Sequence, residues 1–89
     1  MINVHDLEIA NVSQEYWNIR TIDIHFDLFT SRFLLRVSQN EEGIFRPIYM
    51  FHLIDDRDCP YCDGSDKICP VLYVYRNDFF RRLTEFPSI

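Results

Sequence analysis

The residues that could do chemistry are concentrated in one short segment, because all three cysteines of the chain lie between positions 59 and 69. Cys59 and Cys62 form a Cys-x-x-Cys pair with Pro60 inside it, and Cys69 follows later in the same segment. Thiolates at such spacing either coordinate a metal ion or exchange electrons as a dithiol and disulfide pair. The choice between these chemistries decides which class of protein the sequence encodes.

The first interpretation is a structural zinc site. Pro60 and Gly64 favour the tight turn that points backbone amides at thiolate sulfurs. Structural zinc takes four ligands, and the nearest imidazole before the pair is that of His52. We therefore expect one Zn²⁺ per chain, bound by Cys59, Cys62, Cys69 and His52. The alternatives for the fourth position are a water molecule or one of His5, His25, Asp55, Asp56, Asp58 and Asp66.

The segment Cys59-Pro60-Tyr61-Cys62-Asp63-Gly64-Ser65 resembles half of the cysteine-rich repeat of J-domain chaperones, in which Cys-Pro-x-Cys-x-Gly-Ser recurs. Cys69-Pro70 is similar to the start of the next unit, but the position of that unit's second cysteine is occupied by Leu72. The resemblance covers residues 59–72 and implies a knuckle-like turn around a metal.

A second interpretation is a thiol–disulfide oxidoreductase that uses Cys59 and Cys62, because Cys-Pro-Tyr-Cys is similar to the active-site tetrapeptide of glutaredoxins. In that family the motif follows the first strand and opens a helix, whose N-terminus lowers the pKa of the first thiol. Here the motif comes late in the chain, and the nearby aspartates are expected to raise a thiol pKa, which disfavours a nucleophile. A third interpretation is that the cysteines bind nothing and pack as small apolar residues.

Alternating apolar and polar residues predict the first elements that must position this segment. The cleanest alternation predicts strands over 21–28 and 32–38, joined as an antiparallel hairpin. A helix over 30–39 is the alternative for the second of these strands. Slips in the alternation over 1–12 predict a strand with a bulge, and residues 13–17 are expected to form a turn.

The second half of the chain is predicted to complete a single α+β domain of residues 1–89. A third strand over 44–54 contains Pro47, which indicates an edge, a bulge or a late start. A fourth strand is expected at 71–75, so that the cysteine-rich loop of residues 55–70 becomes a hairpin loop stapled by zinc. A short helix over 79–85, capped by Asn77 or Asp78, then packs on a sheet of about four to five antiparallel strands.

Two further groups of residues could form binding surfaces. Asp55, Asp56 and Asp58 suit recognition of a basic protein cleft, although a solvated loop has the same composition. The aromatic residues of the third and fourth predicted strands could share one face, and these are Tyr49, Phe51, Tyr73 and Tyr75. Such a face is either ordinary core or, where nothing covers it, an aromatic binding patch.

The overall composition narrows the class of partner. The chain is 47% hydrophobic and 16% aromatic, which excludes a disordered protein. Its net charge of −5 argues against direct nucleic-acid binding, which needs Lys and Arg to neutralise phosphates. The basic residues are eight Arg and one Lys, and Arg is the cation that suits protein interfaces.

These observations together predict a non-enzymatic, zinc-stabilised protein–protein interaction module. We expect a small adaptor, subunit or inhibitor of a larger complex, including a complex that handles nucleic acid. Its partner would be another protein or a second copy of this chain. The first residues carry neither a basic region nor an apolar run, and no segment approaches a membrane span, so we expect a cytoplasmic protein without a membrane partner.

Overall fold

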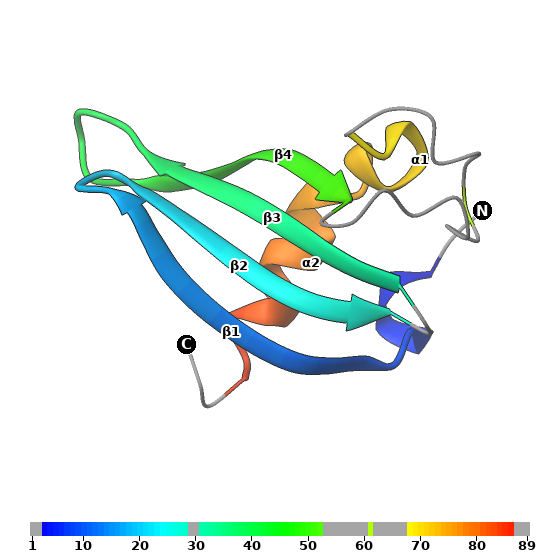
Figure 1. Ribbon diagram of the computed structural model, residues 1–89. Helices are drawn as coiled ribbons and strands as arrows, with labels where there is room; N and C mark the ends of the chain where they lie inside the picture. Colours follow the sequence, from blue (N-terminus) through cyan, green and yellow to red (C-terminus); the bar gives the residue numbers. More distant parts are fainter. Residues whose placement is uncertain (1–2, 29–30, 53–60, 62–67, 87–89) are drawn as a thin grey trace.

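The computed structural model describes residues 3–28, 31–52, 61 and 68–86. Within these residues, four strands form one antiparallel sheet and two short helices follow (Figure 1). The elements in chain order are the 3₁₀ turn η1 (Val4–Asp6), β1 (Ile9–Asn18), β2 (Thr21–Leu28), β3 (Ser31–Gln39), β4 (Phe45–His52), α1 (Pro70–Tyr73) and α2 (Arg76–Leu83). The predicted small antiparallel sheet with a short helix near the C-terminus is confirmed. None of the helices described is long and apolar enough to cross a membrane.

The central hairpin, β2–β3, forms where the alternation of the sequence is cleanest. The two strands pair without a register shift, from Thr21 opposite Ser38 to Leu28 opposite Ser31. Alternate residues of β2, among them Phe26 and Leu28, are fully buried on one face of the sheet. Both predicted strands are confirmed. The alternative helix over 30–39 is wrong, because β3 pairs with β2 on one side and with β4 on the other.

The N-terminal segment forms a 3₁₀ turn followed by a strand, whereas the sequence predicted one strand over 1–12. Val4 is buried in η1, and β1 begins only at Ile9. The predicted bulge is present, since the pairing with β2 shifts between Ala10 and Ser13, where Asn11 has a φ of 52°. The predicted turn at 13–17 is wrong, because β1 pairs with β2 in register from Ser13 to Tyr16 and the register shifts again only between Tyr16 and Asn18.

β4 lies at an edge of the sheet, because the strand order is β1-β2-β3-β4. Pro47 lies opposite Val37, and the register with β3 shifts directly beside this pair. A proline cannot donate a ladder hydrogen bond, so it is tolerated at an edge or next to a bulge. The structural role predicted for Pro47 is therefore confirmed.

The predicted strand at 71–75 is wrong, because this segment is helical. Pro70 occupies the start of α1, where a residue without an N–H is favourable, and the Tyr73 amide donates to the Cys69 carbonyl at 2.9 Å. Leu72 turns into the core, which satisfies the apolar pattern without a strand. The predicted hairpin loop is therefore wrong in topology, since residues 55–70 connect a strand to a helix.

The final helix is correctly predicted in kind but not in its start. α2 begins at Arg76, three residues before the predicted 79–85 helix. Tyr75 occupies the N-cap position, and neither Asn77 nor Asp78 caps the helix. Asp78 instead lies in the first turn, where a negative charge is favourable beside the positive end of the helix dipole.

The core lies between the sheet and α2, which crosses one face of the strands in Figure 1. Phe26 stacks on Phe33 and on Phe79 of α2, with ring centroids 5.9 and 5.6 Å apart. Arg82 of the same helix donates to the carbonyls of Val4, at 2.6 Å, and Leu7, which joins α2 to the N-terminal turn. No described helix covers the opposite face of the sheet, which we call the outer face.

Candidate functional site

The predicted zinc ligands are only partly within the described residues. Cys59 and Cys62 lie outside them, as do three members of the predicted acidic patch, Asp55, Asp56 and Asp58. The part of the chain that the structure describes contains no group of three or more His, Cys, Asp and Glu residues that could hold a metal ion. The zinc site therefore stays a prediction.

Cys69 and His52 lie at the two ends of the cysteine segment, and these ends are fastened together. The Cys69 amide donates to the Met50 carbonyl at 3.0 Å, and Phe51 and Ile68 form an antiparallel bridge. Cys69 is fully buried in the core, while His52 is half-buried with its ring centroid 5.6 Å from that of Phe33. Backbone contacts thus hold the end of β4 against residues 68 and 69.

The predicted aromatic face is wrong as a set of four residues. Tyr49 and Phe51 lie together on the outer face, with ring centroids 5.6 Å apart. Tyr73 and Tyr75 belong to the helical segment and pack against the core on the other side of the sheet. The reason is the helical geometry of residues 70–73, which removes the strand that would have aligned the four rings.

The outer face instead carries a stack of aromatic and arginine side chains drawn from three strands. We call this set, which consists of Trp17, Arg36, Phe51 and Tyr49, the aromatic–arginine stack. The guanidinium carbon of Arg36 lies 4.5 Å from the ring centroid of Trp17 and 5.2 Å from that of Phe51. Trp17 is 62% exposed and Tyr49 42% exposed, so the stack presents its rings to solvent.

Arg36 is fixed at the centre of this stack by a carboxylate beneath it. Asp23 lies directly opposite Arg36 in the β2–β3 register. Arg36 Nε donates to Asp23 Oδ1 at 2.8 Å, and Nη2 donates to Oδ2 at 3.1 Å. Hydrogen bonding to Asp23 raises the pKa of Arg36, desolvation opposes this rise, and the charge of Asp23 adds to it. The guanidinium is therefore charged and held in one orientation.

Charged side chains of β2 and its neighbours on the outer face are paired as well. Arg32 Nη1 donates to Asp27 Oδ1 at 2.8 Å, and Asn11 donates to the second oxygen of Asp27 at 2.7 Å. His25 lies 3.3 Å from Glu15 through the nearest nitrogen and oxygen. The polar face predicted for β2 is thus present, but it is a network of pairs and Asp23 is buried within it.

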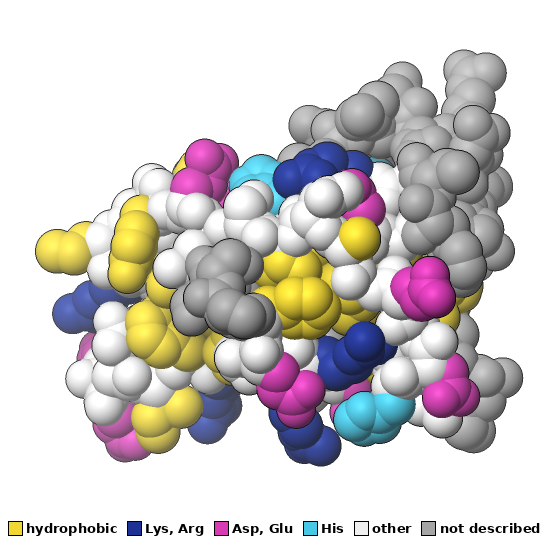
Figure 2. Space-filling view, turned by 90° about the horizontal axis from the view of Figure 1, so that it is seen from below, with side chains coloured by type: hydrophobic (Ala, Val, Ile, Leu, Met, Phe, Trp, Pro, Cys, Tyr) yellow, Lys and Arg dark blue, Asp and Glu magenta, His cyan; other side chains and the backbone are white. Residues whose placement is uncertain are grey.

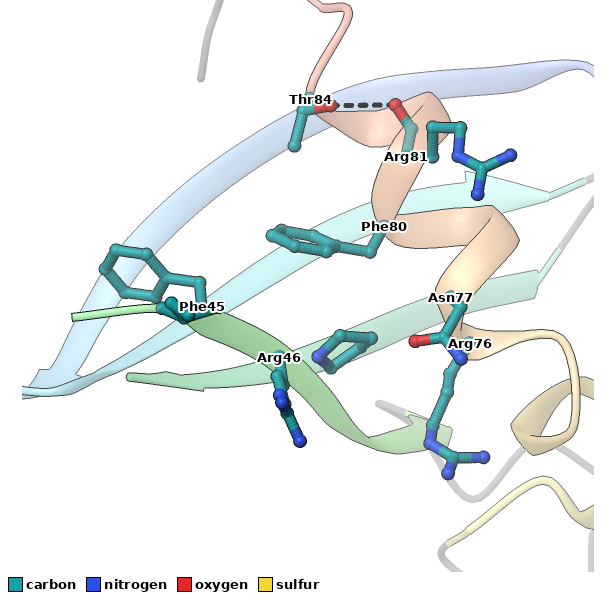
Figure 3. A pocket seen from close by; sticks show the side chains of 9 residues that line it. Phe45, Arg46, Arg76, Asn77, Phe80, Arg81 and Thr84 are labelled. Carbon is teal, nitrogen blue, oxygen red and sulfur yellow. Dashed lines mark hydrogen bonds between the residues drawn. The ribbon is translucent and has the colours of Figure 1, made fainter. Parts of the chain in front are cut away.

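A second candidate site lies between α2 and β4, on the covered side of the sheet. This hollow, which we call the arginine groove, has a volume of about 780 Å³. Its lining contains Arg46, Arg76 and Arg81 but no aspartate or glutamate. Figure 3 shows Phe80 projecting from α2 toward Phe45 of β4, with Arg46 and Arg76 extending on the same side of the two rings.

The arginine groove adjoins a smaller apolar hollow, the apolar niche, of about 200 Å³. Phe45, Phe80 and Thr84 line both spaces. The remaining lining of the niche is Ile22, Ile24 and Val37 of the sheet together with Gln14. Figure 2 shows hydrophobic side chains gathered at the end of the molecule that carries the β1–β2 and β3–β4 turns, and the exposed ones there include Ile19, Ile44 and Phe45.

Sequence reasoning missed the central residues of both candidate sites. A signal for Arg36 existed, because a hairpin of 21–28 with 32–38 can place Asp23 opposite a residue of complementary charge and geometry. The turn predicted for residues 13–17 includes Trp17, so the sequence did not predict that Trp17 lies on the sheet beside Arg36. No local signal joins Arg46 to Arg76, because only the packing of α2 on β4 brings them to one groove.

Comparison with known proteins adds no assignment to this geometry. No protein-family model matches the sequence, and no similar curated protein or solved structure is found.

Proposed function

We propose that the chain is a non-enzymatic protein–protein interaction module that docks through its outer face. The observation that carries this proposal is the aromatic–arginine stack, in which an exposed Trp17 rests on an Arg36 held by a buried carboxylate. Trp, Tyr and Arg are the residues most enriched at the energetic centres of protein interfaces. Here all three types are exposed or half-buried on one side of a rigid sheet.

Pre-organisation is what makes this surface suited to binding. Ordering a rotamer-rich side chain at an interface costs about 0.5–1.5 kcal/mol, which reduces affinity. The two hydrogen bonds from Arg36 to Asp23 order the guanidinium before any partner arrives. The ring of Trp17 is ordered in turn by its contact with that guanidinium. A partner would therefore meet a surface whose largest side chains are already in place.

The charges of the outer face favour a protein partner over a nucleic acid. Arg36 and Arg32 are both paired with carboxylates of β2, so neither is free to neutralise a phosphate. The chain as a whole carries a net charge of −5. Apolar and aromatic contact surrounded by satisfied polar groups is the composition of a protein interface. This supports a role as an adaptor, subunit or inhibitor within a larger protein complex.

The test begins with capture of binding proteins from the source organism by the wild-type chain and by two variants. Trp17→Ala removes the most exposed ring of the stack, and Ile19→Ala is a matched control that truncates a 92% exposed apolar residue outside it. A true partner is retained by the control and lost with Trp17→Ala. Its purified form should then bind Trp17→Ala at least about tenfold more weakly than wild type. Equal affinities for the two variants would exclude the outer face.

We further propose that a structural zinc ion stabilises the module, with Cys59, Cys62, Cys69 and His52 as ligands. Support comes from the fastened ends of the segment, since Cys69 and His52 follow directly from the bridged residues Ile68 and Phe51. A bound structural zinc contributes its binding free energy to folding. Purified protein should contain about one zinc per chain, and Cys62→Ser should lose both the metal and thermal stability.

The same preparation distinguishes zinc from thiol redox chemistry. Protein without metal that carries a Cys59–Cys62 disulfide, with a potential close to that of glutathione, would contradict the zinc proposal and favour the oxidoreductase. His52→Ala tests the fourth ligand separately. Loss of zinc affinity in this variant supports His52, and unchanged affinity assigns the position to another donor.

A further inference from the structure

The arginine groove and the apolar niche are adjoining hollows that the proposed docking face does not use. They lie between α2 and the sheet, whereas the aromatic–arginine stack lies on the other side of the strands. Phe45, Phe80 and Thr84 line both hollows, so the two spaces lie side by side. A ligand at this surface can therefore contact a positively charged space and an apolar space.

The charge of the groove is opposite to that of the chain. The chain has a net charge of −5, yet the groove is lined by three arginines and no carboxylate. In the part of the chain that the structure describes, every ion pair involves other cationic residues, namely His25, Arg32 and Arg36. The charges of Arg46 and Arg76 are thus not neutralised by a described neighbour, and they are available to an anionic ligand.

One of the two arginines is already held in position. The guanidinium carbon of Arg76 lies 4.3 Å from the ring centroid of Tyr73, and its Nη1 donates to the Tyr73 carbonyl at 3.1 Å. Figure 3 shows Arg46 of β4 extending on the same side of the groove, while Arg81 extends from the side of α2 that faces away from β4. Arg46 and Arg76 therefore extend on one side of the groove, which Arg81 does not share.

The apolar niche supplies the second half of the recognition. Ile22, Ile24 and Val37 form its floor on the sheet, and Phe45 and Phe80 stand at its junction with the groove. Removing an apolar side chain from water into such a space is favourable by about 25 cal/mol per Å² of apolar surface. The niche thus suits an apolar group, and the arginines of the adjoining groove suit carboxylates.

We propose that this surface binds an acidic peptide segment of a partner protein, with one apolar side chain in the niche and flanking Asp or Glu side chains on Arg46 and Arg76. The size of the niche favours a single side chain over a lipid, because a long acyl chain needs a deeper cavity than about 200 Å³. The lining also disfavours a nucleotide base, since Gln14 and Thr84 are its only residues with polar side chains.

The experiment is a selection of random displayed peptides on the full-length chain, followed by affinity measurements with labelled synthetic peptides. Enriched sequences should contain an apolar residue flanked by Asp or Glu, and replacing those acids with Asn or Gln should weaken binding about tenfold or more. Affinity should fall as the salt concentration rises, because exposed charge pairs are screened. Enrichment of sequences without acidic residues, or no enrichment at all, would overturn the proposal.

Variants of the chain test whether the peptide binds at the arginine groove. The double variant Arg46→Ala/Arg76→Ala should weaken binding about tenfold or more, from about threefold to fivefold for each exposed pair. Arg20→Ala removes the same charge from the exposed β1–β2 turn, and it should leave the affinity within about twofold of wild type. Equal affinities of the Arg20 and the double variant would refute the assignment.

Three further measurements separate this site from other occupants. Phe45→Ala should weaken binding of the acidic peptide. Trp17→Ala should leave this binding unchanged, because Trp17 lies on the outer face. Tighter binding of single-stranded RNA than of any acidic peptide would overturn the proposal. A concentration-dependent dimer in sedimentation that the double arginine variant abolishes would also overturn it, since the groove would then belong to a second copy of the chain.

Discussion

Two ion pairs on the same pair of strands allow a controlled test of how the outer face is held together. Asp23 faces Arg36 and Asp27 faces Arg32 in the same β2–β3 register, with the same residue types and the same 2.8 Å contact. They differ in burial, because the Asp23 side chain is 4% exposed and that of Asp27 is 25% exposed. Each arginine can be changed to Met, which keeps an apolar stem of similar length.

The expected costs follow from this difference in burial. Arg36→Met leaves a buried carboxylate without the cation that donates two hydrogen bonds to it. Breaking such a pair costs about 3–5 kcal/mol when both partners are buried, and we expect about 3 kcal/mol here because a quarter of the Arg36 side chain is exposed. Arg32→Met should cost about 0.5 kcal/mol, since its pair is more exposed than that of Arg36 and Asn11 still donates to Asp27.

Urea and thermal unfolding followed by circular dichroism measure both costs. A loss of about 3 kcal/mol lowers the Tm of a chain of this size by about 12–24 °C, whereas the Arg32 variant should fall by only a few degrees. The double variant Asp23→Leu/Arg36→Met should recover most of the loss, because an apolar pair replaces the buried charges. Costs for Arg36→Met and Arg32→Met that agree within about 0.5 kcal/mol would refute the argument from burial.

Three further variants test other parts of the fold, each by its free energy of unfolding in urea. Phe26→Ala removes the ring that stacks on both Phe33 and Phe79 and should cost about 4 kcal/mol, and a cost below about 2 kcal/mol would contradict its central place in the core. Ser31→Ala should leave stability unchanged or raise it by up to about 1 kcal/mol, because the buried Ser31 hydroxyl has no hydrogen bond to any described residue, and a clear loss would reveal a missing partner. Gly43→Ala should cost about 1 kcal/mol, because Gly43 has a φ of 84°, and a neutral result would mean that the β3–β4 turn changes conformation.

The success of sequence reasoning along this chain depended on whether one face or two were apolar. Over 21–28 and 32–38 the two faces differ clearly, so the alternation specified both strands and their pairing. Over 71–75 apolar residues occupy both parities, and such a run does not distinguish a buried strand from a buried helix. Pro70 was the available signal for a helix start, whereas the β-branched and aromatic residues that follow it favour a strand.

The candidate sites were harder to predict than the strands, because they depend on contacts distant in sequence. The contact of Trp17 with Arg36 requires the whole of β2 to lie between β1 and β3. The groove requires α2 to pack on β4, which sets Arg76 beside Arg46. Charge and composition alone suggested a protein partner, but only the tertiary arrangement shows that basic side chains collect in one hollow of an acidic chain.

The contact between Arg82 and the N-terminal turn has a consequence for the order in which the protein acquires its structure during synthesis. The strands β1 to β4 follow one another as neighbours, so they can pair as the chain emerges from the ribosome. The apolar face that they create is covered by Phe79 and Leu83, which are made after all four strands, and the N-terminal turn is secured by a residue 78 positions away. The nascent sheet is therefore exposed to premature association until α2 has been synthesised and packs on it.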